Sequence, residues 1–187
     1  PAPNSEDYTR MLQKAYVAAK YADPAAVVVF GGMAQNGVRG WEGWERDFIQ
    51  HVYDHGGGRY FDIMAIHPYT HPDEGLDHLV TLISEARAVL DTNDDSDVPI
   101  WLTEVGWPIP PVAWGRRVLT NEELAEWLVD GYYSQRVLDL ADKVFWYNFR
   151  DSESKGEGYF GLVTGSWERK PQYYAYQQVA CELNVSE

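Results

Sequence analysis

The 187-residue chain has a single cysteine, Cys181, few basic residues and no long apolar run. One cysteine excludes an internal disulfide framework and a metal site built from several thiolates. Twenty-nine acidic against fifteen basic residues give a formal charge of -14, which would repel phosphate backbones and anionic lipid head groups. No stretch reaches the roughly 18 apolar residues that a membrane span requires. We therefore expect a soluble chain that binds neither nucleic acid nor membrane.

Apolar and aromatic residues are abundant. Hydrophobic residues make up 45% of the chain, which contains 8 Trp and 13 Tyr. This composition favours a buried core over disorder. The length suits one domain or one part of a larger one, so we expect a single α/β domain over residues 1–187.

Four short, almost wholly apolar runs have the composition of strands that are buried on both faces, as in a parallel sheet covered by helices. They span residues 26–30, 63–66, 100–103 and 144–147. Helical patterns separate them, and they begin roughly 40 residues apart, which is typical of repeated βα units rather than hairpins. The sequence therefore predicts a parallel α/β sheet.

Periodicity and capping signals mark the expected helices. Thr120 and Glu123 form a capping-box pattern that predicts a helix from Thr120 to about Leu140. Proline is tolerated in the first turn of a helix, so Pro171 predicts the start of the last one. Further helices are expected over residues 8–21, 44–53 and 76–90, the second ending at the glycines 56–58.

A set of mostly polar and aromatic residues follows the carboxyl ends of these strands, where parallel α/β folds bind ligands. They are Gly31, Gly32 and Met33 after the first strand, His67, Pro68 and Tyr69 after the second, Thr103, Glu104 and Trp107 after the third, and Trp146, Tyr147 and Asn148 after the fourth. We expect all of them to face one pocket. A carboxylate, a histidine, hydroxyls and aromatic rings together indicate a sugar site, and the negative net charge fits a neutral substrate. No cofactor and no metal are expected.

Glu104 is the strongest candidate for chemistry, because the buried strand before it would hold its carboxylate rigidly at the mouth of the pocket. Each candidate also has an ordinary structural interpretation. Glu104 can be a solvent-facing glutamate, His67 a hydrogen-bonded structural residue, and Trp107 and Trp146 core residues. Their shared position at one edge of the sheet favours the functional interpretation.

Several segments resemble the second half of clan A glycoside hydrolases, particularly family 39-like enzymes. They are residues 16–24, 30–32, 62–69 with His67-Pro68-Tyr69, 101–108 with Thr103-Glu104-Val105-Gly106-Trp107, and 159–162 ahead of Lys170-Pro171. The resemblance implies an eight-stranded (β/α) barrel, of which this chain supplies a parallel (βα)4 half, strands five to eight. It also implies that Glu104 is the nucleophile, that His67 and Tyr69 line the sugar site and orient Glu104, and that Trp146 forms an aromatic floor.

The resemblance further implies hydrolysis with retention of configuration. The nucleophile forms a glycosyl-enzyme, while a second carboxyl group about 5 to 5.5 Å away protonates the leaving oxygen and then activates water. In the family this acid/base glutamate belongs to an Asn-Glu motif that ends the fourth strand, and the chain departs from the pattern by lacking that half. Asn121-Glu122 lies inside the capping box and is rejected as the acid. Glu74, Glu153 and Glu157 lie in predicted loops and are weak substitutes.

Three functions remain open. The leading hypothesis is a retaining β-glycoside hydrolase acting on O-glycosidic bonds of an oligo- or polysaccharide, or its nucleophile-bearing half. The main alternative is a non-catalytic carbohydrate-binding half-barrel or an incomplete fragment. Metal-assisted hydrolysis through His67, His71 and Asp73 ranks far below, because Pro68 and Pro72 make this stretch a loop, whereas a four-residue spacing aligns ligands on a helix.

A half-barrel leaves two unpaired sheet edges and an open apolar interior. We therefore expect association, either as a homodimer that forms a pseudo-barrel or with a missing N-terminal half-barrel. The sequence identifies neither the sugar nor the linkage. It does not fix the compartment, although a polysaccharide substrate favours an extracellular one.

Overall fold

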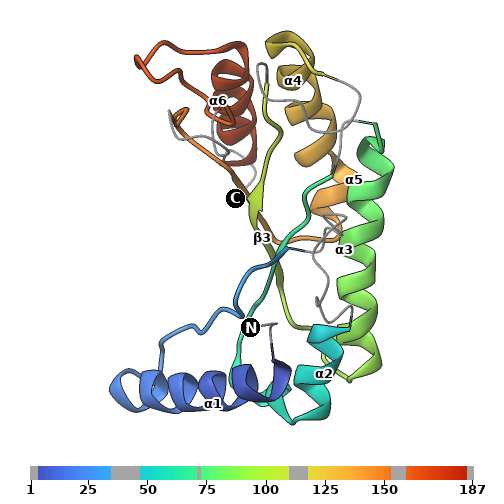
Figure 1. Cartoon of the computed structure of the whole chain (residues 1–187), viewed down its shortest axis with the longest axis vertical. Helices are drawn as coiled ribbons and strands as arrows, with labels where there is room; N and C mark the ends of the chain where they lie inside the picture. Colours follow the sequence, from blue (N-terminus) through green and yellow to red (C-terminus); the bar gives the residue numbers. More distant parts are fainter. Residues whose placement is uncertain (1–3, 35–46, 71–72, 110–117, 153–158, 185–187) are drawn as a thin grey trace.

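The computed structural model describes residues 4–34, 47–70, 73–109, 118–152 and 159–184. Figure 1 shows a twisted sheet with helices around it. The strands are β1 (Met33–Ala34), β2 (Met64–His67), β3 (Ile100–Val105) and β4 (Lys143–Trp146). All neighbouring strands are parallel, and their order across the sheet follows their order along the chain. The predicted parallel α/β sheet is confirmed.

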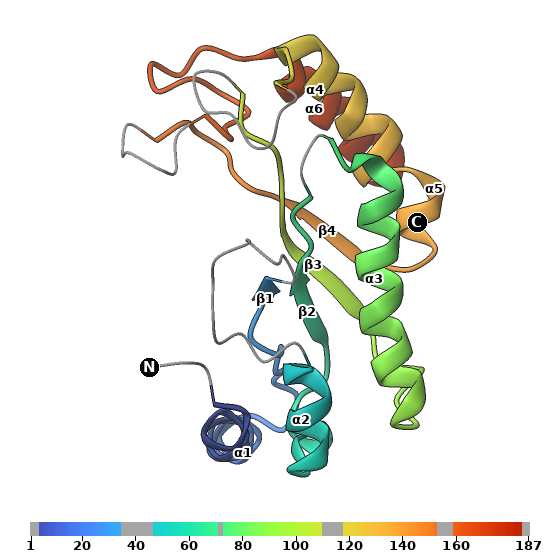
Figure 2. The same ribbon diagram turned by 45° about the vertical axis from the view of Figure 1, so that its right-hand side comes forward.

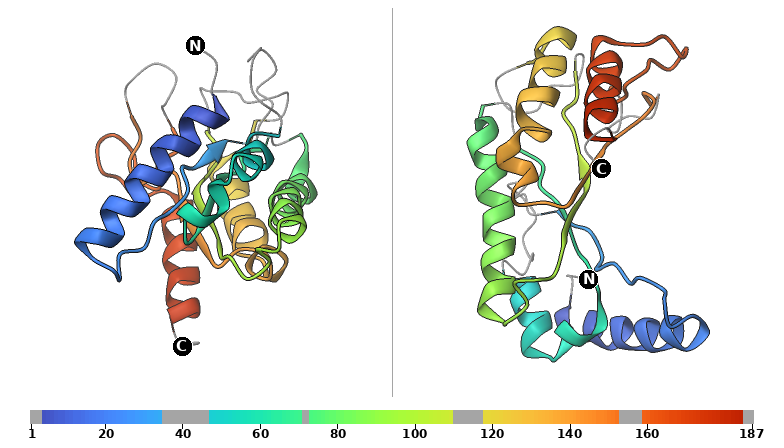
Figure 3. Two further views of the ribbon diagram at one scale, coloured as in Figure 1. Left: turned by 90° about the horizontal axis from the view of Figure 1, so that it is seen from below. Right: turned by 180° about the vertical axis from the view of Figure 1, so that it is seen from behind.

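The helices follow the strands in the predicted alternation. They are α1 (Ser5–Ala22), α2 (Phe48–Asp54), the 3-10 helix η1 (Gly57–Tyr60), α3 (Gly75–Thr92), α4 (Asn121–Trp127), the π-helix η2 (Leu128–Tyr132), α5 (Gln135–Leu138) and α6 (Pro171–Asn184). Figure 2 shows α2, α3 and α5 along one side of the sheet, with α4 and α6 near the carboxyl ends of the strands. Figure 3 shows α1 across the opposite end. Within the described residues, no helix has the length and apolar character needed to cross a bilayer.

Three capping signals act as predicted. The Thr120 hydroxyl accepts the N–H of Glu123 at 3.1 Å, and the Glu123 carboxylate accepts the N–H of Thr120 at 2.9 Å, which completes the capping box. Pro171 begins α6. Gly56 follows the end of α2 with a φ of 79°, a left-handed conformation that glycine adopts without a steric penalty.

The first predicted strand, residues 26–30, is wrong in its position. Only one parallel bridge forms there, between Val29 and Ile63, and the assigned strand β1 begins further along the chain. The N–H of Val28 donates to the carboxylate of Asp62 at 2.7 Å rather than to a neighbouring strand. Two backbone bonds still join this segment to the residues before β2, from the Asp62 N–H to the Val28 carbonyl at 2.7 Å and from the Phe30 N–H to the Ile63 carbonyl at 2.9 Å, and the Asp62 side chain ends the pairing at Val28.

The helix predicted from Thr120 to about Leu140 is divided into α4, η2 and α5. A turn separates the last two, because both the backbone N–H and the hydroxyl of Ser134 donate to the Gly131 carbonyl, at 3.1 and 2.7 Å. Local hydrogen bonds of this kind compete with the helical pattern. The other expected helices agree with α1, α2 and α3 within the described residues.

One face of the sheet is packed against helices, and the other is open at β4. Four fully buried side chains face the helices: Met64, Ile66, Ile100 and Leu102. On the other face, the Lys143 ammonium lies 4.6 Å from the ring centre of Trp101, whose ring lies 5.9 Å from that of Phe145. Phe145 is 44% exposed. Burial on both faces was therefore a wrong expectation for β4, since no described helix covers this side of it.

Candidate active site

Glu104 lies near the carboxyl end of β3, beside the ends of β2 and β4. Side chains alternate along a regular strand, and Leu102 is buried on the helix-covered face, so regular alternation would turn Glu104 toward the helices. The register against β4 shifts between Leu102 and Val105, and Val105 takes the next buried position. Such a bulge redirects side chains. Here it allows the consecutive residues Thr103 and Glu104 to reach the same neighbour, His67.

Two side chains that follow or end β2 contact the Glu104 carboxylate. The Tyr69 hydroxyl donates a hydrogen bond of 2.9 Å to Oε2. Nδ1 of His67 lies 3.5 Å from the same oxygen, and its Nε2 lies 2.9 Å from the hydroxyl of Thr103. The Glu104 side chain is 36% exposed and that of His67 20%. The structure thus brings three predicted site residues together and leaves the carboxylate accessible.

Burial sets the charge of the groups around Glu104. Burial lowers the pKa of the His67 imidazole from its ordinary value of 6.5, although the Glu104 charge acts in the opposite direction. Burial also raises the pKa of the Tyr69 phenol, as does the adjacent carboxylate. At neutral pH, His67 is therefore mainly uncharged and Tyr69 keeps its proton. The negative charge of Glu104 is not neutralised by either neighbour.

Aromatic rings pack beside Tyr69. The ring of Tyr147, which directly follows β4, lies 6.4 Å from that of Tyr69 and 5.5 Å from that of Phe160. Phe160 in turn lies 6.2 Å from Tyr69. Phe160 is buried, whereas Tyr147 is partly exposed. Tyr147 was expected at the pocket but not singled out as a binding residue, and Phe160 was not expected there at all.

Trp107 lies in the core rather than at the pocket. Its indole is fully buried, lies 4.3 Å from the ring of Trp127 and 4.9 Å from that of Tyr132, and donates a hydrogen bond to the Thr70 carbonyl. A sugar ring cannot stack on a fully buried indole. The structural interpretation of Trp107 therefore replaces the expectation that it binds substrate.

Trp146 also faces the helix layer. It pairs in register with Val105, its ring lies 5.5 Å from that of Tyr132, and its Nε1 donates to the Phe160 carbonyl at 3.1 Å. The next residue but one, Asn148, has a buried Oδ1 without a hydrogen-bond partner among the described residues. The ring beside Tyr69 is thus that of the next residue, Tyr147, and not that of Trp146.

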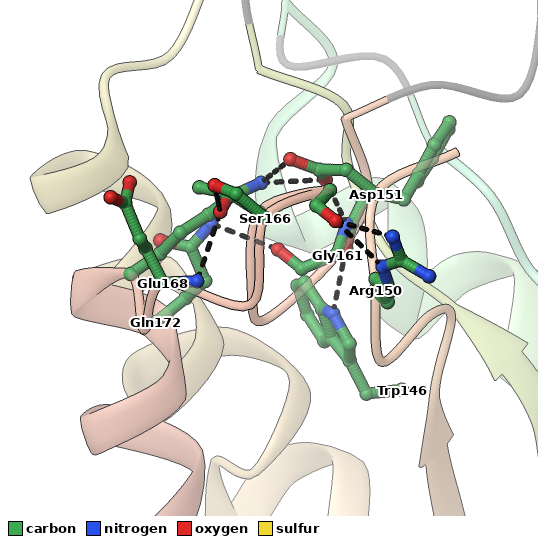
Figure 4. A network of polar contacts seen from close by, with 11 residues as sticks. Trp146, Arg150, Asp151, Gly161, Ser166, Glu168 and Gln172 are labelled. Atoms are coloured by element: carbon green, nitrogen blue, oxygen red, sulfur yellow. Dashed lines mark hydrogen bonds and ion pairs between the residues drawn. The ribbon is translucent and has the colours of Figure 1, made fainter. Parts of the chain in front are cut away.

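A polar network joins described residues on the segments between β4 and α6, and Figure 4 shows part of it. Lys170 and Asp151 form an ion pair of 2.6 Å with side chains only 5% and 8% exposed. Asp151 also accepts the N–H of Gly161 at 2.8 Å. Nε of Arg150 donates to the Gly165 carbonyl at 3.0 Å. These contacts hold the backbone next to the aromatic group at the site.

The expected substitutes for the acid/base residue have different positions. Glu153 and Glu157 lie outside the described residues. Glu74 immediately precedes α3, with its carboxylate 3.9 Å from Nε2 of His78. Asn121-Glu122 opens α4, as predicted from the capping box. Glu74 and Glu122 are therefore both residues of helix starts.

The metal alternative rested on His67, His71 and Asp73. His71 lies outside the described residues, and Asp73 lies in the turn before α3. In the described part of the chain, no three His, Cys, Asp or Glu side chains gather in a way that suits a metal ion.

Comparisons with known proteins agree with this architecture. No protein-family model and no curated protein matches the sequence. Among solved structures, a glucosidase from Croceicoccus marinus matches with a TM-score of 0.72 and 17% identity, over 95% of this chain and 36% of that one. A family 39 glycoside hydrolase from Bacteroides cellulosilyticus matches with a TM-score of 0.71 and 26% identity, over 92% and 37% of the two chains. A family 39 β-xylosidase from Caulobacter crescentus matches with a TM-score of 0.64 and 19% identity, over 93% of this chain and 37% of that one.

The chain therefore spans little more than a third of the length of these structures. By its fold, it is a partial domain like those of family 39 glycoside hydrolases.

Proposed function

We propose that the chain carries the nucleophile half of the active site of a retaining β-glycoside hydrolase. The observation that carries this proposal is the accessible Glu104 carboxylate, which accepts a hydrogen bond from Tyr69 and lies beside an uncharged His67. The glycoside hydrolases among the matching structures support the class of reaction.

In the proposed reaction, a Glu104 oxygen attacks the anomeric carbon and the bond to the leaving oxygen breaks, while an acid protonates that oxygen. Water then attacks the glycosyl-enzyme ester, which releases the sugar with its configuration retained and regenerates the carboxylate. The hydrogen bond from Tyr69 fixes Oε2 and so orients Oε1 for the attack. The acid/base glutamate comes from the partner that completes the barrel, at about 5 to 5.5 Å from Glu104.

The proposed substrate is the β-glycoside of an oligo- or polysaccharide. Tyr147 offers a partly exposed ring next to Tyr69, and this position supports it as the surface against which the sugar packs. Asn148 follows with an amide oxygen that has no partner among the described residues.

The open face of the sheet supports completion by further βα units, so that the four strands correspond to strands five to eight of a barrel. Trp101 and Phe145 form an apolar surface on this face, and Phe145 is 44% exposed. Within the described residues, β1 and β4 each pair on one side only. A second copy of the chain or an N-terminal half-barrel would cover both the face and the edges.

Intact-protein mass spectrometry tests the nucleophile. The folded chain is incubated with 2-deoxy-2-fluoro glycosides that carry an activated leaving group, because these reagents need a nucleophile but little help from an acid. We expect a covalent adduct on Glu104 that is absent in Glu104→Gln and retained in the control Glu74→Gln. Folded protein that no sugar of the panel modifies would overturn the proposal and favour a non-catalytic carbohydrate-binding role.

A further inference from the structure

Two consecutive glycines, Gly31 and Gly32, precede β1, and their surroundings differ sharply. Neither has a φ in the left-handed region, so the backbone at both positions suits an alanine. A Cβ built on Gly31 would lie 3.0 Å from the Tyr8 hydroxyl. A Cβ built on Gly32 would lie 2.0, 2.6 and 2.7 Å from Nε2, Cε1 and Cδ2 of His67. Gly32 is therefore needed for space rather than for conformation.

The His67 ring fills this space, and it contacts both Thr103 and Glu104. Its Nε2 lies 2.9 Å from the Thr103 hydroxyl, and its Nδ1 lies 3.5 Å from Oε2 of Glu104. An approach of 2.0 Å is far shorter than any non-bonded contact, so a methyl group on residue 32 would force the imidazole to move. Both contacts depend on the present position of the ring.

We propose that Gly32 is a positioning residue for His67, because it leaves the space in which the imidazole bonds Thr103 and stands beside Glu104. The catalytic consequence rests on the proposed function of Glu104, whereas the placement of the ring does not. Gly32 thus affects the surroundings of the Glu104 carboxylate indirectly, through the position of the His67 ring. The Tyr69 hydroxyl, on the segment after β2, bonds the same carboxylate.

The effect of a side chain at Gly32 is confined to the site. Because the His67 side chain is 20% exposed, the displaced ring has room to swing outward instead of straining the core. A Gly32→Ala chain should therefore fold as the wild type does, with His67 in a different rotamer. This separates a loss of positioning from a loss of structure.

The first test is an NMR titration of the histidine imidazoles in the full chain, with the His67 signals assigned from His67→Asn. Glu104 is the charged group that faces this ring, Thr103 is the polar group that bonds it, and Tyr69 bonds Glu104. In wild type and in the control Gly31→Ala, the pKa of the His67 imidazole should be below its ordinary value of 6.5. In Gly32→Ala the pKa of the His67 imidazole should be closer to that ordinary value, since the displaced ring is then solvated. An unchanged titration of His67 in folded Gly32→Ala would overturn the proposal.

The second test measures the rate at which a 2-deoxy-2-fluoro glycoside modifies Glu104. We expect at least a tenfold lower rate in Gly32→Ala and an unchanged rate in Gly31→Ala. In a His67→Ala background, the Gly32→Ala change should have no further effect, because the ring with which it collides is gone. A further decrease in that background would contradict the proposal. If no sugar modifies the wild type, the proposed function fails and the titration alone decides the role of Gly32.

Discussion

The hydroxyl of Tyr69 donates a 2.9 Å hydrogen bond to Oε2 of Glu104, which joins the segment after β2 to the end of β3. Both residues follow apolar runs on adjacent parallel strands, so the sheet itself sets the distance between them. The bond makes one carboxylate oxygen different from the other before any substrate is present.

Tyr69→Phe should slow modification of Glu104 by a 2-deoxy-2-fluoro glycoside by about 10- to 100-fold. A hydrogen bond to a charged group contributes about 1.5 to 3 kcal/mol, and about 1.4 kcal/mol corresponds to a factor of ten. Tyr147→Phe is the matched control, because it removes a nearby hydroxyl that does not bond Glu104. Equal rates for Tyr69→Phe and wild type would show that the hydrogen bond does not assist the attack.

We expect the free energy of unfolding to decrease in mild acid because of His67. Its pKa in the folded chain is below 6.5, so the unfolded chain binds this proton more readily. The contribution to stability is therefore full above about pH 6.5 and is lost as the pH falls from there toward the lower folded pKa. Urea unfolding at a series of pH values should show that His67→Asn removes this part of the slope, at most about 1.4 kcal/mol per pH unit for one proton.

The histidine on α3 provides the control for this measurement. His78→Asn also removes one imidazole, at a position outside the site, so the difference between the two variants isolates His67. A His67→Asn slope identical to that of wild type would contradict the prediction.

Lys170→Met should lower the free energy of unfolding by about 3 to 5 kcal/mol, because it leaves the carboxylate of Asp151 buried without a counter-charge. Adding Asp151→Asn should restore part of the loss. Arg136→Met, which removes the exposed pair with Asp77, should change stability little. Chemical denaturation of the variants checks this, and a small effect of Lys170→Met would mean that water reaches the pair.

Phe145→Glu tests the open face of the sheet. If a second copy covers this face, the wild type should elute as a dimer in size-exclusion chromatography with light scattering, and the variant as a monomer with an unchanged circular dichroism spectrum. Tyr174→Glu, at an exposed position of α6, should leave the dimer intact. A monomeric wild type would exclude self-association and favour an N-terminal half-barrel as the partner.

The strands β2, β3 and β4 could be predicted from the sequence because each follows an almost wholly apolar run, although only β2 and β3 are largely buried and one face of β4 is open. The predicted runs at 63–66, 100–103 and 144–147 agree with β2, β3 and β4 to within two residues. The first run makes only a short backbone pairing around Val29, and the Val28 N–H bonds a side chain, the carboxylate of Asp62, which no local pattern reveals.

The site was predictable in its position and less so in its detail. His67, Tyr69 and Glu104 meet because the ends of neighbouring parallel strands meet. The bulge in β3 depends on the offset between two strands, so the sequence of one strand does not contain it. The same offset decides that Tyr147 and not Trp146 lies beside Tyr69, so the sequence alone does not give the orientation of these two rings.

The order of the strands has a consequence for how the protein is made. Within the described part of the chain, each strand pairs only with the strands immediately before and after it. Among these described strands no pairing waits for a segment from the far end of the sequence, so each βα unit can dock on its predecessor as it leaves the ribosome. The newest edge of the sheet is then always the template for the next unit, while the outer edge of β1 waits for whatever completes the sheet.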